Sequence, residues 1–131
     1  MSSSRAISGA ATEPRWRPVL QEAAFESSRG VLTGRLLVPW DLPIFAGHFP
    51  AMPIVPGVVQ LGWVAELAQA HGLAAGPFNG IVSAKFRRIL RPGVELQVRL
   101  QPGRLEGEVQ FELKARDFVV SCGRLRFGGR C

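Results

Sequence analysis

The segment from Pro56 to His71, PGVVQLGWVAELAQAH, constrains the fold of this chain more than any other feature. Proline fits the first turn of a helix, where its missing N–H has no partner to lose, and Gly72 is a typical stop after the last turn. Apolar residues occur on nearly every side of this predicted helix, whereas a surface helix shows one apolar stripe. We therefore expect the helix to be buried on most sides.

The segments around this helix indicate strands separated by Pro and Gly turns. In VELQVRL, residues 94–100, apolar and polar side chains alternate with the period of two that is typical of a half-buried strand. A flat sheet cannot cover a helix that is apolar all round, so a curved antiparallel sheet must wrap it. The sequence predicts an α+β protein with the hot-dog arrangement, a curved antiparallel sheet around one long buried central helix. The predicted strands are residues 19–25, 31–39, 81–90, 94–100, 108–115 and 118–127, with a bulge at Gly123.

Length and composition indicate one domain. The chain has 131 residues, 47% of them hydrophobic, which is enough for one core. Residues 1–14 are rich in Ser and Ala without a long apolar run, so we expect a disordered N-terminal tail, no signal peptide, and a single hot-dog domain over residues 15–131. No apolar run approaches the ~18 residues of a membrane span, and the expected location is the cytoplasm. We expect Cys122 and Cys131 to be free thiols, and we expect no metal site.

So short a chain buries this helix poorly alone, and its outer strands keep free edges. Pairing of two copies edge to edge solves both problems. We therefore expect a double-hot-dog homodimer.

The net charge of +6, from sixteen Lys and Arg against ten Asp and Glu, favours an acidic partner. An acidic carrier protein and nucleic acid are both candidates. No basic run of five residues and no nucleic-acid-binding motif is present, so nucleic acid is the less favoured of the two. The candidate carrier-binding residues are Arg87, Arg88 and Arg91, which Arg15, Arg17 and Arg35 can join.

Two stretches resemble the β-hydroxyacyl-acyl carrier protein dehydratases, the FabZ/FabA group of hot-dog enzymes. GHFPAMPIVPGVVQL, residues 47–61, resembles the signature loop of that group. KFRRILRPGVEL, residues 85–96, resembles its KFRRPVxPGDxL strand and turn. The likeness covers residues 31–127, and PGVVQL followed by Trp63 looks most like the branch associated with aryl-polyene clusters. The resemblance implies dehydration of 3-hydroxyacyl thioesters to trans-2-enoyl thioesters, with no cofactor beyond the phosphopantetheine of the acyl carrier protein that holds the substrate.

The residues of the loop suit this chemistry. Dehydration needs a base for the proton next to the carbonyl, an acid for the leaving hydroxyl, and donors for the thioester oxygen. His48 suits the role of base, because an unperturbed imidazole titrates near ~6.5. The amides of Gly57 and Val58 begin a helix and have no partner inside it. The resemblance accordingly implies that His48 is the catalytic histidine and Gly57 the amide donor, with an acyl tunnel past Phe49, Val59 and Trp63.

The acid is where this sequence departs from the family pattern. By the resemblance, a carboxylate is expected fourteen residues after the histidine, at Gly62, where it would meet the histidine of the other subunit. Glycine cannot protonate a hydroxyl, and in a helix interior it costs ~1 kcal/mol relative to alanine. Glu66 lies one turn further on the same face and is the only carboxylate of the helix, so it is the candidate substitute acid. Its Cα is displaced by about 5–6 Å along the axis, which its longer side chain recovers only in part.

Three functions therefore stay open. The first is a 3-hydroxyacyl-carrier-protein dehydratase whose acid is relocated or supplied by water. The second is a non-catalytic hot-dog subunit that binds acyl carrier protein or an active homologue. The third is an acyl thioesterase, which Gly62 also disfavours because hot-dog thioesterases generally place a carboxylate on or near this helix.

Overall fold

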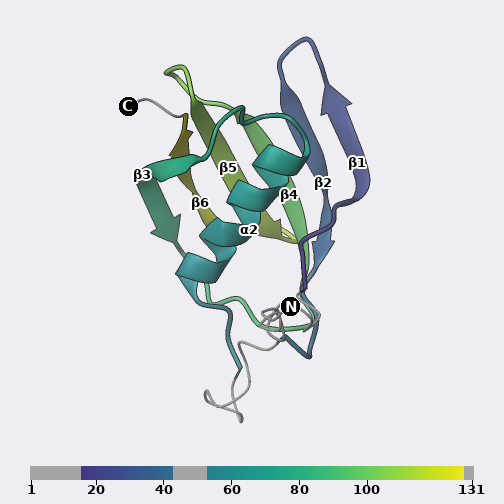
Figure 1. The fold of residues 1–131 in the computed structure, drawn as a ribbon. Helices are drawn as coiled ribbons and strands as arrows, with labels where there is room; N and C mark the ends of the chain where they lie inside the picture. Colours follow the sequence, from purple (N-terminus) through teal and green to yellow (C-terminus); the bar gives the residue numbers. More distant parts are fainter. Residues whose placement is uncertain (1–15, 43–52, 129–131) are drawn as a thin grey trace, which may run out of the picture.

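The computed structural model describes residues 16–42 and 53–128, and in this part of the chain one helix lies against one sheet (Figure 1). The sheet has six strands in the order β1-β2-β4-β5-β6-β3, and every neighbouring pair is antiparallel. This arrangement agrees with the predicted α+β class. The elements are β1 Gln21–Glu26, β2 Val31–Leu37, α2 Gly57–Ala70, β3 Phe78–Phe86, β4 Glu95–Pro102, β5 Glu108–Ala115 and β6 Phe118–Phe127.

Helix α2 begins and ends within one residue of the predicted limits. Pro56 has an extended backbone and its carbonyl accepts the amides of Val59 and Gln60. At the other end Gly72 has a positive φ of 81° and Leu73 donates to the carbonyl of Ala68, as in a Schellman cap. The proline and the glycine that frame the segment therefore set its limits.

One face of α2 stays exposed, which differs from the expected burial on most sides. Gln60, Leu61, Trp63, Val64, Ala65, Leu67 and Ala68 are buried. Val58, Gly62, Glu66, Gln69 and Ala70 are exposed. We call the line through Val58, Gly62 and Glu66 the open stripe. It exists because a single sheet reaches the helix from one side only.

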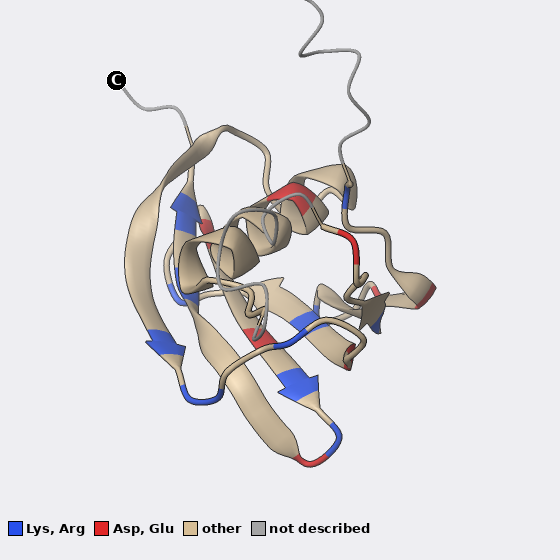
Figure 2. Cartoon of the chain, turned by 90° about the horizontal axis from the view of Figure 1, so that it is seen from below, with Lys and Arg blue, Asp and Glu red and all other residues tan. Residues whose placement is uncertain are grey.

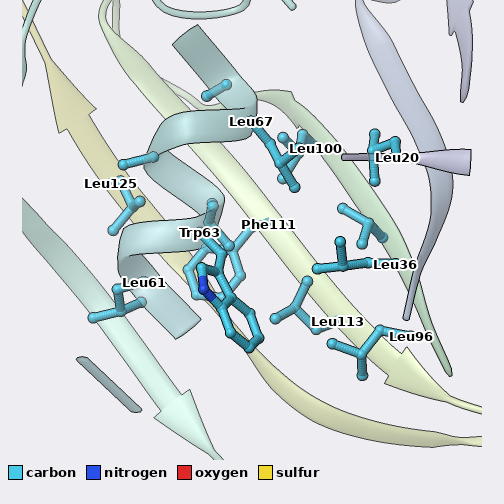
Figure 3. Close-up of a cluster of buried hydrophobic side chains, with 14 of the residues drawn as sticks. Leu20, Leu36, Leu61, Trp63, Leu67, Leu96, Leu100, Phe111, Leu113 and Leu125 are labelled. Carbon is cyan, nitrogen blue, oxygen red and sulfur yellow. The ribbon is translucent and has the colours of Figure 1, made fainter. Parts of the chain in front are cut away.

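The core lies between α2 and the sheet. Leu61, Trp63 and Leu67 of the helix belong to one hydrophobic cluster with the buried side chains of the sheet, and Trp63 lies beside Phe111 (Figure 3). The alternating pattern of the sequence is confirmed in β4 and β5, where the apolar member of each pair is buried. The fully buried side chains of the sheet include Leu32, Leu36, Leu96, Val98, Leu100, Phe111, Leu113 and Leu125.

Strand β3 differs from its prediction at both ends. It begins at Phe78 and ends at Phe86, so the expected range of 81–90 is wrong by three and four residues. The end has a clear cause, because the amides of Arg87 and Arg88 both turn to the carbonyl of Val120 in β6. Beyond this point Leu90 leaves the sheet and its carbonyl accepts the amide of Val55, which ties the segment to the start of α2.

The bulge expected at Gly123 belongs to the neighbouring strand. The register between β3 and β6 shifts between Ile81 and Ser83. Gly123 faces this irregularity, and an added Cβ there would collide with the carbonyl oxygen of Ser83. The glycine therefore permits the close approach of β3. No helix in the described ranges is long and apolar enough to cross a membrane.

Candidate active site

The start of α2 forms the part of the predicted site that the structure describes. His48 and Phe49 fall within residues 43–52 and lie outside the described residues. Gly57 and Val58 are the first two residues of the helix. Among the backbone hydrogen bonds of the described residues, neither of their amides has a carbonyl partner, whereas Val59 and Gln60 donate to Pro56. These two amides carry the positive end of the helix dipole and can donate to an oxyanion.

The ring of Phe86 lies directly over Gly57. A Cβ built on Gly57 would be 2.7 Å from Cζ of this ring and 2.8 Å from Cε1, closer than real contacts allow. Because Gly57 has no side chain, the ring of Phe86, the last residue of β3, can lie this close to the start of α2. Together they line a surface pocket of about 260 Å³, to which Gln60 and Arg88 also contribute.

A buried polar pair holds this end of the helix to the sheet. The hydroxyl of Ser121 in β6 donates to Oε1 of Gln60 at 2.8 Å, and Nε2 of Gln60 donates to the carbonyl of Val55 at 3.2 Å. Both residues are buried, Gln60 at 2% exposure and Ser121 at 0%. Because the pair joins α2, β6 and the segment before the helix, it fixes where the free amides of Gly57 and Val58 lie.

Gly62 and Glu66 both lie on the open stripe. Among the described residues, a Cβ added to Gly62 would meet no atom within 4 Å, so the position has room for a side chain. The Glu66 carboxylate is 48% exposed and lies 3.5 Å from Nη1 of Arg17, an ion pair at the protein surface (Figure 2 shows the acidic position on the helix). At 1.5 Å per residue, Gly62 is about 7–8 Å along the helix axis from Gly57 and Glu66 about 13–14 Å. Gly62 therefore lies nearer than Glu66 to the amides at the start of the helix.

The candidate tunnel residues of α2 face the core. Val59 is partly buried against the hydrophobic cluster. Trp63 is 7% exposed, and its ring lies 4.9 Å from that of Trp16 in an edge-to-face contact. In the part of the chain that the structure describes, Trp63 therefore fills space between helix and sheet. Their role in an acyl tunnel stays a prediction.

The three candidate carrier-binding arginines are exposed. Arg87 and Arg88 directly follow β3, and Arg91 follows the buried Leu90. The guanidinium of Arg88 lies 3.9 Å from the ring centroid of Phe118, a cation–π contact. Arg87 and Arg88 both line the pocket at Gly57, so this basic charge lies at the candidate site and not on a remote surface.

Sequence reasoning missed two contributors to this site, Phe86 and the Gln60–Ser121 pair, and it also missed the burial of Glu108 elsewhere in the sheet. The alternation in β5 predicted Glu108 on the polar face, yet its side chain is 1% exposed beneath Arg124 and Arg126, at 3.6 and 3.7 Å. Glu108 follows turn residues, and the two arginines lie in the next strand, so no local pattern indicates its burial. Among the described residues, no group of His, Cys, Asp and Glu is arranged to hold a metal ion, and Cys122 is a free thiol.

Comparisons with known proteins agree with the features above. The family model described as ApeI-like, ApeI dehydratase, matches residues 24–124. The 3-hydroxyacyl-[acyl-carrier-protein] dehydratase FabZ of Chloroflexus aggregans is 36% identical over 99 residues, which are 70% of this chain and 69% of that protein. The FabZ of Thermotoga petrophila is 36% identical over 123 residues, 87% of this chain and 88% of that protein.

The solved structures bear on the fold. A chain of the dehydratase heterocomplex ApeI:P from Xenorhabdus doucetiae superposes with a TM-score of 0.76 at 24% identity. The match covers 87% of this chain and 100% of that chain. One helix on a six-stranded antiparallel sheet, shared with this dehydratase, supports the hot-dog fold, and the family model matches most of the chain. The chain therefore belongs to the ApeI-like dehydratases, relatives of the FabZ enzymes.

Proposed function

We propose that this chain is a 3-hydroxyacyl-carrier-protein dehydratase that forms trans-2-enoyl thioesters. One observation carries the proposal: Gly57, whose amide has no carbonyl partner among the described residues, lines a pocket to which Phe86 also contributes. A thioester oxygen placed there accepts hydrogen bonds that strengthen as negative charge develops on it. The family loop, with His48 between Gly47 and Phe49, directly precedes this helix start.

In the proposed reaction, His48 takes the proton from the carbon next to the thioester carbonyl. The electron pair of the broken C–H bond forms the new double bond, and the 3-hydroxyl leaves with one proton as water. The amides of Gly57 and Val58 stabilise the enolate-like oxygen during this transfer. The proton for the hydroxyl comes from Glu66 or from a water molecule bound in the space beside Gly62.

The proposed active form is the double-hot-dog homodimer. Strand β3 is the last strand of the sheet, so one edge of its backbone has no neighbour among the described strands. Phe78, Ile81 and Phe86 on this strand are exposed apolar residues, and Val58 at the start of the open stripe is 74% exposed. A second copy paired along β3 would cover these apolar side chains and satisfy the edge.

The two histidines of the chain provide a matched test of the base. We expect His48→Ala to lower kcat/KM for a 3-hydroxyacyl carrier substrate by roughly 10²–10⁴-fold, the usual effect of losing a general base. His71→Ala removes an exposed imidazole at the end of α2 and should leave the rate unchanged. Equal rates of enoyl thioester formation in the wild type and His48→Ala would exclude His48 as the base, and no enoyl thioester from either protein would exclude the dehydratase function.

The source of the acid has a separate test. If Glu66 donates the proton, Glu66→Gln abolishes turnover, because the amide keeps the shape but has no proton to give at neutral pH. Arg17→Gln removes the ion-pair partner of Glu66 and leaves the carboxyl in place, so it controls for loss of the surface contact. If both variants keep full activity, water and not Glu66 supplies the proton.

A second candidate is a non-catalytic subunit that pairs with an active homologue. The empty space at Gly62 favours it, since nothing in the described residues replaces the missing side chain there. The similar chain from Xenorhabdus doucetiae belongs to a dehydratase heterocomplex. Under this alternative the purified chain is inactive alone, and activity that depends on His48 appears only after an acid-bearing homologue is added.

A further inference from the structure

An extended segment of the chain crosses one flank of helix α2 before strand β1 begins. Pro18 and Leu20 of this segment are buried and Trp16 packs against the core, whereas Arg17 and Val19 are exposed. We call residues 16–20 the crossing segment, which is the purple stretch that leads into β1 in Figure 1. Its alternate side chains turn inward, although it belongs to no strand of the sheet.

The crossing segment joins the sheet to the helix. At one end Leu20 lies over Gly34 of β2, where an added Cβ would be 3.0 Å from Cβ of Leu20. At the other end the ring centroid of Trp16 lies 4.9 Å from that of Trp63 on α2. The segment therefore closes the flank between β2 and α2.

Trp16 meets α2 at the border between the buried face of the helix and the open stripe. Trp63 is 7% exposed, while Gly62 directly before it belongs to the open stripe. Next to Trp16, Nη1 of Arg17 lies 3.5 Å from Oε2 of Glu66, which is also on the open stripe. The crossing segment therefore borders the exposed face of the helix.

Side chains hold the crossing segment in place. Outside the helix and the strands, none of the backbone hydrogen bonds among the described residues involves residues 16–20. The Arg17–Glu66 ion pair is exposed at both ends, so it adds little to the hold. A segment with few backbone hydrogen bonds opens at a lower free-energy cost than a strand of the sheet. Movement of Trp16 away from Trp63 therefore needs no break in the sheet.

The contact of the two indoles lies on the path expected for the acyl chain. Val59 and Trp63 are one turn apart, so they share one side of α2. At 1.5 Å per residue, Trp63 lies about 9 Å along the helix axis from Gly57. An acyl chain that is held by its thioester at Gly57 and follows this side of the helix therefore reaches the Trp16–Trp63 contact.

We propose that Trp16 sets the length of the acyl chain by closing the end of an apolar site that runs from Gly57 past Val59 to Trp63. This inference rests on the proposed function and names its substrate class, thioesters of short acyl chains. Longer chains enter only when the ring of Trp16 moves away from Trp63. Trp16 is a specificity-determining residue here and takes no part in proton transfer.

The test is binding of butyryl and decanoyl pantetheine to the full chain, measured by calorimetry. Both ligands lack the 3-hydroxyl, so neither can be dehydrated. The measured quantity is the ratio of the butyryl Kd to the decanoyl Kd within one protein, so a general loss of binding cancels. We expect Trp16→Ala to raise this ratio by roughly tenfold, because burial of about two further methylene groups in the vacated space gives such a factor.

Two control variants separate the ring of Trp16 from the segment that carries it. Val19→Ala shortens an outward side chain of the same segment, 70% exposed in the wild type, and should change the ratio less than twofold. Trp16→Phe keeps an aromatic ring against Trp63 and should also stay within twofold. If Trp16→Ala does not fold, Trp16→Leu takes its place, since it keeps an apolar contact without a ring, and we expect a rise of roughly threefold.

Two results would overturn the role of Trp16. One is an unchanged ratio in the folded variant without the ring. The other is an equal rise in Val19→Ala, which would mean that loosening of the crossing segment, and not the ring, changes the preference. Turnover of 3-hydroxybutyryl and 3-hydroxydecanoyl pantetheine separates this inference from the proposed function. If the binding ratio shifts as expected but no protein forms enoyl thioester, the acyl site stands and the dehydratase function fails. If the wild type forms enoyl thioester and the ratio does not shift, only the role of Trp16 fails.

Discussion

Gly62 lowers the stability of helix α2, and its place on the open stripe leaves free space beside it. Glycine in a helix interior loses ~1 kcal/mol relative to alanine. The position is exposed and a Cβ there would meet no atom within 4 Å, so no clash requires the glycine. Within the described residues, glycine at position 62 therefore has no packing reason.

Gly62→Ala should accordingly stabilise the protein. We expect the free energy of unfolding to rise by about 0.5–1 kcal/mol and Tm by about 3–5 °C, because alanine restricts the unfolded chain and adds no strain. Thermal unfolding followed by circular dichroism measures the change. A loss of stability would mean that something close to Gly62, such as a second copy, occupies the space that this chain leaves empty.

Gly57 differs from Gly62, because the ring of Phe86 occupies the space that a Cβ on Gly57 would need. Gly57→Ala pushes a methyl group into the ring of Phe86, whose outer end can move, so we expect little loss of stability but at least a tenfold loss of kcat/KM as the pocket deforms. Gly80→Ala is the matched control, since an added Cβ at Gly80 meets nothing within 4 Å. Phe86→Ala added to Gly57→Ala should restore part of the activity by removing the clash. Full activity of Gly57→Ala would show that the pocket under Phe86 is not used.

Helix α2 is positioned by polar contacts as well as by its apolar face. The Gln60–Ser121 hydrogen bond is buried, and its loss leaves Oε1 of Gln60 without a donor. We expect Ser121→Ala to cost about 1–3 kcal/mol, and the double variant Gln60→Leu with Ser121→Ala to cost less than the sum of the single changes. Urea unfolding of the four proteins measures this coupling, with Gln110→Ala on the exposed face of β5 as a control near zero. Additive single effects would mean that the two side chains do not interact.

The strands show which limits a sequence can predict. Strands β5 and β6 have their predicted limits, because the Arg116–Asp117 turn, with Arg116 at a φ of 59°, marks the point where the chain passes from one strand to the other. The start of β3 was hidden by Pro77, Asn79 and Gly80, residues typical of turns. Its end depends on the Val120 carbonyl in another strand, which no local pattern contains.

The candidate site also has parts that the sequence could predict and parts that it could not. The amides of Gly57 and Val58 could be predicted, since Pro-Gly at a helix start is a local signal. The ring of Phe86 over Gly57 could not, because the contact joins residues twenty-nine positions apart and depends on the register of β3 against β6. The sequence also could not predict which face of α2 stays exposed. A helix that is apolar nearly all round does not indicate on which side the sheet will lie.

In the described part of a single chain, the β3 edge with its exposed apolar side chains and the open stripe both stay uncovered. If two copies pair along β3, a charge placed on that strand should prevent it. We expect the wild type to sediment as a dimer and Ile81→Lys as a monomer in analytical ultracentrifugation. Val19→Lys, at a site 70% exposed beside β1, should remain a dimer. Dissociation by both variants, or by neither, would contradict pairing along β3.

The central claim is that this chain has the base and the amide donors of a dehydratase but lacks the acid at position 62. Gly62→Asp tests it most directly, because it supplies the missing carboxyl at a position where an added Cβ meets no described residue within 4 Å. The measurement is kcat/KM for enoyl thioester formation from a 3-hydroxyacyl carrier substrate, in the wild type, Gly62→Asp and Gly62→Ala. We predict a gain of roughly 10²-fold or more in Gly62→Asp and none in Gly62→Ala. An equal rate in all three proteins, or a loss in Gly62→Asp with the fold intact, would contradict the claim.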